Sequence, residues 1–354
     1  MAASDRSPNA TVVALQANFY RVRLERPQAG VPLGARLLCT CRGRLRKIGQ
    51  SVVVGDRVAV ADLDPQQRRG TIAAVGPRQT RLRRPPLANA DRLLAVMALA
   101  EPPPDPLQLS RFLVAAEASG LTPLVGLNKS DRVSAGERER WCQRLRAWGY
   151  DAVPISATGG WGLDALERRL RGHLTAMAGP SGAGKSSTID GLIPHAQLRV
   201  GAISRKTRRG RQTTRHVELF ELPQGGLLAD TPGFKRPQLD CEPQALARYF
   251  PEARARLAVG ACQFADCLHQ AEPQCAVRGD WERYQHYLQL LEEARARAQA
   301  RQQQRDREAS TKVKTRREGR LEREPKLDPR KYRRPSRRRQ NQTLQGLLDE
   351  AEAE

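Results

Sequence analysis

Apolar and polar positions alternate in short runs through the first 80 residues of the chain. Gly and Pro separate three such runs, VVALQANFYRVRL, ARLLCTCRGRLRK and DRVAVADL, which are rich in Val, Leu, Tyr and Arg. Runs of this length and composition between turn residues predict β-strands. Several short strands in so short a segment predict a small all-β barrel, and the OB-fold is the common basic example.

Three arginines lie at alternate positions beside Gly43: Arg42, Arg44 and Arg46. If this stretch is a strand, the alternation places all three side chains on one face. Such a face predicts contact with the phosphates of a nucleic acid. A solvated strand face without a partner accounts for the spacing equally well, so both interpretations stay open.

The pattern of apolar and polar positions changes near Asp91. The segment before it (RQTRLRRPP, 78–86) is basic and ends in prolines, which predicts a linker. Strand-like runs such as LLAVMALA, TPLVGLN and AVPIS then alternate with helical stretches. One of these, LQLSRFLVAAEASG, is expected to end at Gly120. Alternating strands and helices predict a parallel sheet with helices on its faces.

Helical and then compositionally biased sequence follows residue 243. WERYQHYLQLLEEARARAQARQQQ predicts a long helix whose apolar stripe ends near Ala298, and the sequence after it is dense in Arg and Lys. High charge with few apolar residues predicts disorder there in the absence of a partner. The pattern therefore divides the chain into four parts: an OB-fold over 1–80, an α/β domain over 81–243, a helical domain over 244–300 and a basic tail over 301–354.

Composition adds a strong electrostatic constraint. The formal net charge is +23 with a pI near 10.7, while hydrophobic residues make up 39% of the chain. A folded protein with this positive excess is expected to bind a polyanion, nucleic acid first and an anionic membrane surface second. No run approaches the roughly 18 apolar residues of a membrane span, and the N-terminus lacks a charged region followed by an apolar run, so we expect a cytoplasmic protein.

The sequence GPSGAGKSS fits the P-loop pattern G-x-x-x-x-G-K-[ST]. It follows the apolar run LTAMA and precedes a helical stretch, which is the context that this motif requires. Backbone N–H groups would surround phosphate oxygens, Lys185 would reach the β- and γ-phosphates, and the Ser186 hydroxyl would bind Mg²⁺. The predicted phosphate-binding residues are Gly179, Pro180, Ser181, Gly182, Ala183, Gly184, Lys185, Ser186 and Ser187.

A second motif, NKSD, is predicted to select the base and consists of Asn128, Lys129, Ser130 and Asp131. The Asp131 carboxylate would accept hydrogen bonds from N1–H and the exocyclic amine of guanine, a donor pair that adenine lacks. Asn128 would contact the other edge of the ring, and the Lys129 stem would lie on its face. The motif ends a predicted strand, where doubly wound sheets bind ligands. Ser156 and Ala157, after the run AVPI, predict a loop that supports the base, although an ordinary strand-to-helix turn explains them equally well.

The sequence DTPG, after the apolar run GGLLA, fits D-x-x-G. Asp230 would hold Mg²⁺ through a water molecule, and the Gly233 N–H would sense the γ-phosphate. Upstream, Thr214, slightly favoured over Thr213, would close over Mg²⁺, and a polar turn before a strand is the alternative. Base recognition thus precedes the P-loop, which is a circular permutation of the usual GTPase order. Such rejoining at loops is tolerated because chain termini often lie close together.

A cluster of metal-binding residues follows the α/β domain: Cys262, Cys267, His269 and Cys275. Three thiolates and one imidazole supply the four ligands of a closed tetrahedral zinc site, which is structural because no position stays open. The spacing is not that of the common zinc fingers. Cys39, Cys41, Cys142 and Cys241 are expected to be ordinary core or surface thiols.

Together these motifs resemble those of the RsgA family, the circularly permuted GTPases of small-ribosomal-subunit biogenesis. The resemblance covers roughly residues 11–300 and rests on CRGRLRK, VGDRV, NKSD, GPSGAGKSS, GRQTT, DTPGF and the cysteine–histidine cluster followed by CAVR. It implies an OB-fold, a permuted G domain and a zinc-binding helical domain. It further implies a GTPase that docks on the small subunit late in maturation, is stimulated by it and leaves after hydrolysis.

Two departures from the family pattern concern hydrolysis. The family usually has a His, proposed to be catalytic, where this chain has Gln212, and Arg215 stands in the last Thr position. Phe234 follows D-x-x-G, where many GTPases have a Gln that orients water. We expect Gln212 to orient the attacking water once the ribosome orders the switch, with His216 as a second candidate. The predicted catalytic residues are Gln212, Thr214 and Lys185.

The sequence therefore predicts a ribosome-assembly GTPase that uses GTP, Mg²⁺ and one structural Zn²⁺. Its predicted partners are the small ribosomal subunit and its rRNA, with the basic tail as an rRNA anchor, and we expect a monomer that binds no membrane. Gln212 and Phe234 keep open an RNA-binding or chaperone module in which hydrolysis is negligible. A P-loop ATPase or small-molecule kinase is a third candidate, and NKSD argues against it.

Overall fold

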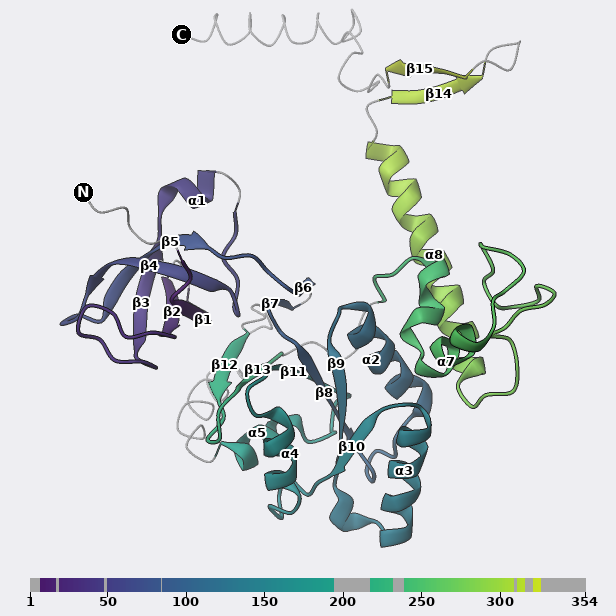
Figure 1. Ribbon diagram of the computed structural model, residues 1–354, viewed down its shortest axis with the longest axis horizontal. Coiled ribbons are helices and arrows are strands. Elements are labelled where there is room, and N and C mark those ends of the chain that lie inside the picture. The colour runs from purple at the N-terminus through teal and green to yellow at the C-terminus, as the bar shows by residue number, and fades with distance from the viewer. Residues whose placement is uncertain are drawn as a thin grey trace, which may run out of the picture. The chain divides into compact units, whose positions relative to one another are not determined.

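The computed structural model describes residues 7–16, 19–47, 50–83, 85–193, 217–231, 239–308, 311–315 and 321–325 (Figure 1). The chain forms two compact units, Met1–Ala294 and Arg295–Glu354. The first unit contains a barrel, an α/β domain and a helical segment with the cysteine–histidine cluster. The second contains the end of a long helix and a hairpin.

A closed barrel forms the N-terminal part of the first unit (Figure 1). Its strands are β1 (Ala10–Gln16), β2 (Phe19–Leu24), β3 (Arg36–Cys41), β4 (Arg57–Asp64) and β5 (Arg69–Val75). They follow the order β1-β2-β3-β5-β4, and pairing of β1 with β4 closes the ring. Alternate side chains such as Val12, Val22 and Val58 point inward and are fully buried. The predicted all-β barrel is confirmed.

The predicted strand face of Arg42, Arg44 and Arg46 is wrong, because residues Gly43–Lys47 form the short helix α1. Leu45 packs into the barrel core and fixes this helix against it. Since a helix repeats every 3.6 residues, alternate residues do not share a face. Arg42 instead pairs with Asp62, at 3.0 Å, on the surface of the barrel.

A mixed sheet forms the centre of the α/β domain. Its order is β10 (Asp151–Pro154), β9 (Thr122–Asn128), β8 (Arg92–Ala98), β11 (Leu174–Ala178), β13 (Leu227–Asp230) and β12 (Glu218–Glu221). Neighbouring strands from β10 to β13 run parallel, and β12 runs antiparallel to β13. The predicted parallel sheet is confirmed, with one antiparallel edge strand among the described residues.

Helices cover both faces of this sheet (Figure 1). They are α2 (Pro106–Ala118), α3 (Ala135–Ala147), α4 (Leu163–Leu170) and α5 (Lys185–Leu192). In β8, Leu93, Ala95 and Met97 face the core that α2 and α3 share. The alternate residues Leu94 and Val96 face the core beneath α4 and α5. After Arg92, this central parallel strand is therefore apolar at every position, as its unbroken run LLAVMALA indicates.

Local sequence determines where α2 begins and ends. The Asp105 side chain accepts hydrogen bonds from the N–H groups of Leu107 and Gln108, and Pro106 occupies the first turn. Gly120 follows the helix with φ of +73°, a conformation that suits glycine. The predicted helix end at Gly120 is confirmed.

The segment expected to be a linker is partly structured. β6 (Arg81–Arg83) and β7 (Pro86–Ala88) pair as a hairpin. Leu82 and Leu87 bury their side chains in the core beneath α2 and α3. Two apolar residues in an otherwise basic segment are thus enough to fold it onto the α/β domain.

The helical part of the first unit packs against α2. Its elements are the 3₁₀ helix η3 (Pro243–Tyr249), α7 (Pro251–Val259) and the beginning of α8 (Tyr284–Glu308). Val114 and Ala115 of α2 share one apolar core with Phe250, Leu290 and Leu291. This core joins the helical segment firmly to one face of the α/β domain.

Arg283 lies fully buried at the centre of that junction. Its guanidinium carbon lies 4.9 Å from the Trp148 ring, 5.1 Å from that of Tyr150 and 4.9 Å from that of Phe250. It forms a two-point ion pair with Glu252, with 2.7 Å between Nε and Oε1. A buried cation needs such an anion and polarisable rings because it has lost its hydration.

The second unit contains a short hairpin of β14 (Thr311–Thr315) and β15 (Leu321–Pro325). Lys312 lies opposite Glu324, and Lys314 lies opposite Glu322. These ten residues differ from the disorder that their composition predicts, and the remainder of the tail beyond them lies outside the described residues. No described helix is long and apolar enough to cross a membrane.

Replacing Arg283 with Met tests the junction. The change leaves the Glu252 carboxylate, whose side chain is only 12% exposed, without its cation, so we expect a loss of about 3 kcal/mol in the free energy of unfolding. Arg254→Ala is the matched control, because Arg254 is 44% exposed in its pair with Glu117 and its loss should cost about 1 kcal/mol or less. Urea denaturation followed by tryptophan fluorescence measures both, and equal losses would contradict the role of Arg283.

Candidate nucleotide and metal sites

The predicted nucleotide motifs meet at one edge of the sheet. NKSD begins at the end of β9, Ser156 lies just beyond β10, the P-loop follows β11, and Asp230 ends β13. These strands run parallel, so their carboxyl ends share an edge, where such sheets bind ligands. Gly233, Thr214 and Gln212 lie outside the described residues, and their predicted roles stay predictions.

Two glycines allow the P-loop its tight path. Gly179 has φ of +145°, and a Cβ there would lie 2.2 Å from the Val96 carbonyl oxygen. Gly184 has φ of +88° and precedes the first residue of α5, Lys185. The first N–H groups of a helix have no partner within it, so the start of α5 can bind phosphate. The Lys185 ammonium donates to the carbonyls of Gly179, at 2.9 Å, and Pro180, at 2.7 Å, which places the cation within the loop.

Asn128 joins the P-loop to the base-support loop. Its side-chain nitrogen donates to the Ala183 carbonyl at 2.8 Å, and its side-chain oxygen accepts from the Ala157 N–H at 3.0 Å. The residue is only 2% exposed. Both ends of the Asn128 amide thus bind protein backbone, and its predicted contact with the guanine ring stays a prediction. Asn128 therefore positions the two loops.

Asp131 is held ready to accept hydrogen bonds. The Ser156 hydroxyl donates to its carboxylate and lowers the pKa of Asp131 below the usual value. Ser156 is itself buried, and its oxygen accepts from the Gly159 N–H at 3.1 Å. An exposed carboxylate that is oriented and ionised suits the two N–H donors of a guanine edge. The Ser130 hydroxyl, by contrast, donates to the Leu127 carbonyl inside the fold.

The loop after β8 lies beside these motifs, and sequence reasoning missed it. The Lys129 ammonium donates to the Glu101 carbonyl, and Arg132 pairs with the Glu101 carboxylate at 2.5 Å. A Cβ on Gly182 of the P-loop would lie 3.5 Å from Pro102. The run of three prolines after Glu101 was the available signal, because it predicts a stiff, extended loop at the end of a strand.

Asp230 lies in a partly apolar position at the end of β13. Burial raises the pKa of its carboxyl, the Lys185 ammonium opposes this, and the Glu218 carboxylate adds to it. The next residue, Thr231, is buried, and its hydroxyl donates to the Met177 carbonyl of β11. Asp230 is thus fixed next to the P-loop lysine, where a magnesium ion would stabilise its ionised form.

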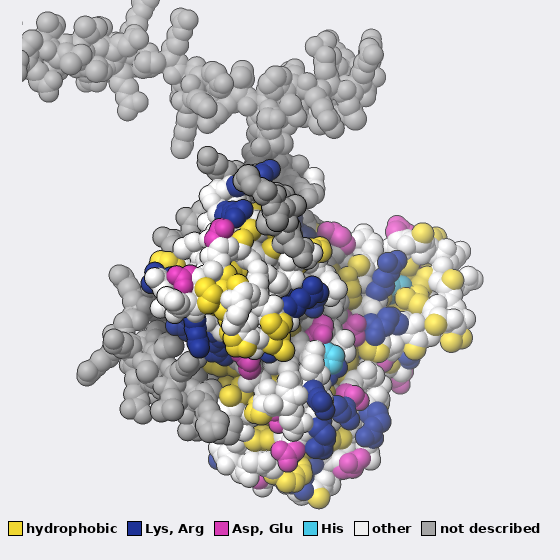
Figure 2. All heavy atoms as spheres, turned by 60° about the vertical axis from the view of Figure 1, so that its left-hand side comes forward, with side chains coloured by type: hydrophobic (Ala, Val, Ile, Leu, Met, Phe, Trp, Pro, Cys, Tyr) yellow, Lys and Arg dark blue, Asp and Glu magenta, His cyan; other side chains and the backbone are white. Residues whose placement is uncertain are grey.

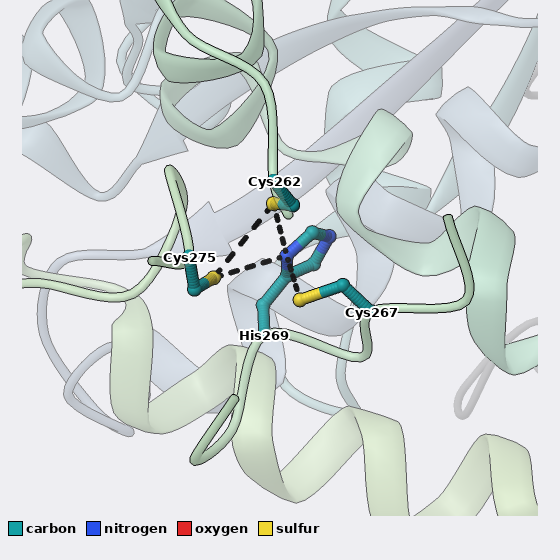
Figure 3. A group of neighbouring side chains, drawn as sticks. All are labelled: Cys262, Cys267, His269 and Cys275. Carbon is teal, nitrogen blue, oxygen red and sulfur yellow. Dashed lines mark hydrogen bonds between the residues drawn. The ribbon is translucent and has the colours of Figure 1, made fainter. Parts of the chain in front are cut away.

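The four predicted metal ligands point toward one another (Figure 3). His269 Nδ1 lies 3.5 Å from the sulfur of Cys262, 3.4 Å from that of Cys267 and 3.3 Å from that of Cys275. The sulfurs of Cys262 and Cys275 are 3.9 Å apart. A tetrahedral zinc ion with bonds of about 2.3 Å to sulfur and 2.0 Å to nitrogen separates sulfur from nitrogen by roughly 3.5 Å and two sulfurs by roughly 3.8 Å. The cluster therefore fits a zinc ion.

Neighbouring residues hold the cluster in shape, and the sequence pattern did not reveal them. The Glu272 carboxylate accepts from the N–H groups of Leu268 and Gln270. From α8, the Tyr284 hydroxyl donates to the His269 carbonyl and the Tyr287 hydroxyl to the Leu268 carbonyl, both at 2.8 Å. These hydrogen bonds fix the backbone that carries the ligands and so help to orient them.

The barrel, the sheet and the order of the motifs along it define a circularly permuted P-loop GTPase. The chain belongs to the RsgA family, and its residues 75–240 match the RsgA GTPase family. It is 54% identical over 360 residues to the small ribosomal subunit biogenesis GTPase RsgA of Trichormus variabilis, which covers 97% of each chain. It is 53% identical over 332 residues to the protein of the same name from Microcystis aeruginosa, covering 94% of this chain and 92% of the relative.

Two solved structures are similar over most of their length. YjeQ from Thermotoga maritima is 29% identical and matches with a TM-score of 0.67, over 81% of this chain and 98% of its own. YloQ, a circularly permuted GTPase, is 28% identical and matches with a TM-score of 0.68, over 84% of this chain and 98% of its own. The predicted family and fold class are confirmed.

Replacing Asn128 with Ala tests how the nucleotide site is held. The change leaves the Ala183 carbonyl and the Ala157 N–H without partners, at about 1–3 kcal/mol each, so we expect GTP affinity to fall at least about tenfold. Asn89→Ala is the matched control, because Asn89 also joins two segments, through the Gly55 carbonyl and the Gln79 N–H, away from the nucleotide. Titration with a fluorescent GTP analogue measures the affinity, and wild-type binding by the Asn128 variant would contradict this role.

Replacing Cys267 with Ser tests the metal site. We expect the purified protein to bind one zinc ion and the variant to lose most of it, with a fall in Tm of at least about 5 °C on a scale of roughly 2–4 °C per kcal/mol. Cys241→Ser is the matched control, since Cys241 is 6% exposed and Cys267 is 7% exposed, yet Cys241 lies outside the cluster. Metal analysis by mass spectrometry and thermal unfolding provide the readouts. Equal zinc in both variants would refute the assigned ligand.

Proposed function

We propose that this protein hydrolyses GTP during late maturation of the small ribosomal subunit and is stimulated by that subunit. The observation that carries the proposal is the joined nucleotide site. Asp131, oriented by Ser156, is suited to guanine, and Asn128 ties its surroundings to a P-loop. The relatives from T. variabilis and M. aeruginosa are named as GTPases of this process, which supports the same assignment.

The proposed site assigns separate tasks to its residues. The base is bound by NKSD and the loop of Ser156 and Ala157, and the phosphates by the P-loop. Mg²⁺ would be held by Ser186, by Thr214 and, through water, by Asp230, and it would neutralise charge on the phosphates. Gly233 would sense the γ-phosphate. Lys185 would stabilise the charge that develops on the transferred phosphoryl group.

Water activation is assigned to Gln212. A glutamine amide can orient an attacking water by hydrogen bonds, as P-loop GTPases require, although it cannot act as a base. Phe234 follows the D-x-x-G motif and offers no polar group for this purpose. The zinc ion, held by Cys262, Cys267, His269 and Cys275, would stabilise the fold of the helical domain without taking part in hydrolysis.

We infer that the main partner is rRNA, bound by a monomer in the cytoplasm. The net charge of +23 favours the phosphate backbone. Lys and Arg side chains appear in several separate groups on the face seen in Figure 2, which suits a chain of phosphates contacted at many points. The tail run RKYRRPSRRR would add a further anchor for the phosphate backbone.

A second candidate is an RNA-binding module that GTP regulates without appreciable hydrolysis. The residues Gln212 and Phe234 favour it, because neither is the usual water-activating group at its position. The two candidates differ in turnover and not in nucleotide binding, so hydrolysis has to be measured directly.

We expect GTP hydrolysis to rise at least about tenfold when purified small ribosomal subunits are added, and ATP hydrolysis to stay at background. Gln212→Ala should lower the stimulated rate at least about tenfold and leave GTP affinity unchanged. Without the amide, the attacking water is no longer held in the position that the transition state requires. His216→Ala is the comparison that tests the second catalytic candidate. Phosphate release under multiple turnover gives the rates. Tight GTP binding without stimulation would favour the RNA-binding module instead.

A further inference from the structure

Strand β12 lies between the nucleotide site and the barrel (Figure 1). On one side it pairs with β13, where Glu218 lies opposite Asp230. On the other side it pairs with β1 of the barrel, where Glu218 lies opposite Ala14. The edge of the α/β sheet is therefore covered by the protein's own barrel, and one residue borders both the barrel and the predicted magnesium-binding carboxylate.

Three barrel arginines meet the acidic side chains of this strand. We call Arg21, Arg23 and Arg36 the arginine cluster. Arg23 Nε lies 3.1 Å from Glu221 Oε2, and Arg36 Nη2 donates to Glu221 Oε1 at 3.1 Å. Arg21 lies 3.9 Å from Glu218. Two carboxylates of β12 thus pair with three cations that the barrel presents, and one positive charge stays unbalanced.

The arginine cluster of the barrel favours binding of an anion, whether or not β12 is present. Arg23 on β2 and Arg36 on β3 are direct cross-strand partners, and like charges at facing positions repel. The Arg23 Nε is buried and makes no hydrogen bond, despite its distance to Glu221. Two facing guanidinium groups with an unused N–H donor suit an oxyanion that can accept several hydrogen bonds, and phosphate is such a group.

The ion pairs to β12 are exchangeable. The side chains of the arginine cluster are 30–41% exposed, and those of Glu218 and Glu221 are 29% and 35% exposed. Ion pairs so open to water are weak and sensitive to salt. The remainder of the barrel adds to the attraction for a polyanion, since residues 10–75 carry eleven Lys or Arg and four Asp or Glu.

We propose that the arginine cluster is a binding site for RNA phosphate, and that the carboxylates of β12 occupy it in the free protein. RNA that binds the barrel replaces these carboxylates and frees the side chains of Glu218 and Glu221 from the arginine cluster. Because Glu218 lies opposite Asp230 and its charge acts on that residue, the release reaches the nucleotide site. GTP and RNA then bind with a coupling free energy, and each changes the affinity of the other by the same factor.

The helical domain is attached through an apolar core as well as through ion pairs. Its attachment to the α/β domain centres on Arg283, which is fully buried, and RNA cannot reach it. The inference rests on the proposed function, because it takes GTP and RNA as the two ligands. It adds to that function a route by which RNA contact acts on the nucleotide site.

Glu221→Gln tests the proposal, because Glu221 contacts only the barrel arginines among the ion pairs of β12. The dissociation constant for small ribosomal subunits is measured with a non-hydrolysable GTP analogue and with GDP. In the wild type we expect the two constants to differ at least about fivefold. In Glu221→Gln the ratio of the two dissociation constants should fall toward one. The reason is that subunits then bind more tightly in the nucleotide state in which the wild type binds them weakly.

Asp62→Asn is the matched control. It also frees a barrel arginine, Arg42, but Asp62 does not contact β12, so the wild-type factor should be kept. Arg36→Ala separates the two roles of the arginine cluster, which are to bind RNA and to hold the carboxylates of β12. Like Glu221→Gln, this variant should lose the nucleotide dependence. Unlike Glu221→Gln, it should bind subunits more weakly in both nucleotide states. A Tm close to that of the wild type verifies that each variant is folded.

Three results would overturn the inference: no nucleotide dependence in the wild type, an unchanged factor in Glu221→Gln, or an equal loss in Asp62→Asn. If the wild type does not bind subunits at all, the proposed function fails. The same comparisons with a fluorescent RNA hairpin then decide the inference by itself, because the arginine cluster would recognise phosphate in either RNA.

Discussion

The side chain of Asn128 joins loops that come from three separate parts of the chain. It ends β9, donates to the Ala183 carbonyl of the P-loop and accepts from the Ala157 N–H of the base-support loop. Gly184 must lack a side chain, because a Cβ there would lie 2.1 Å from the Asn128 amide nitrogen. The loops that would bind phosphate and base therefore keep one spacing, and this preorganisation is what a small ligand needs in order to bind both.

Two kinds of interface surround this site. The helical domain packs through an apolar core and a buried guanidinium, so separating the two would expose apolar surface and an unpaired charge. The barrel contacts β12 through partly exposed ion pairs and one residue pair between strands, and Val13 and Val54 of the barrel also share the apolar core of the α/β domain. The ion pairs are the part of the barrel attachment that a charged ligand can replace.

Some features followed from local sequence because they depend on residues close along the chain. The P-loop, the NKSD motif and the cysteine–histidine cluster carry their chemistry within a few residues, and the ends of α2 follow from Asp105 and Gly120. The arginines at 42, 44 and 46 were misassigned because alternation is also compatible with a short helix once Leu45 finds a core. The hairpin of β6 and β7 was missed because its strands are short and basic.

The sequence alone determined the family, the parallel sheet, the permuted order of the motifs and the four residues that fit zinc. Only the tertiary structure decided which side chains meet across long separations: Asn128 with Ala183, Ser156 with Asp131, Arg283 with Glu252, and the arginines of the barrel with Glu221. Periodicity and local motifs report the face on which a residue lies and the chemistry that it offers. They do not identify the residue that it contacts, because that contact depends on how elements far apart in the sequence pack together.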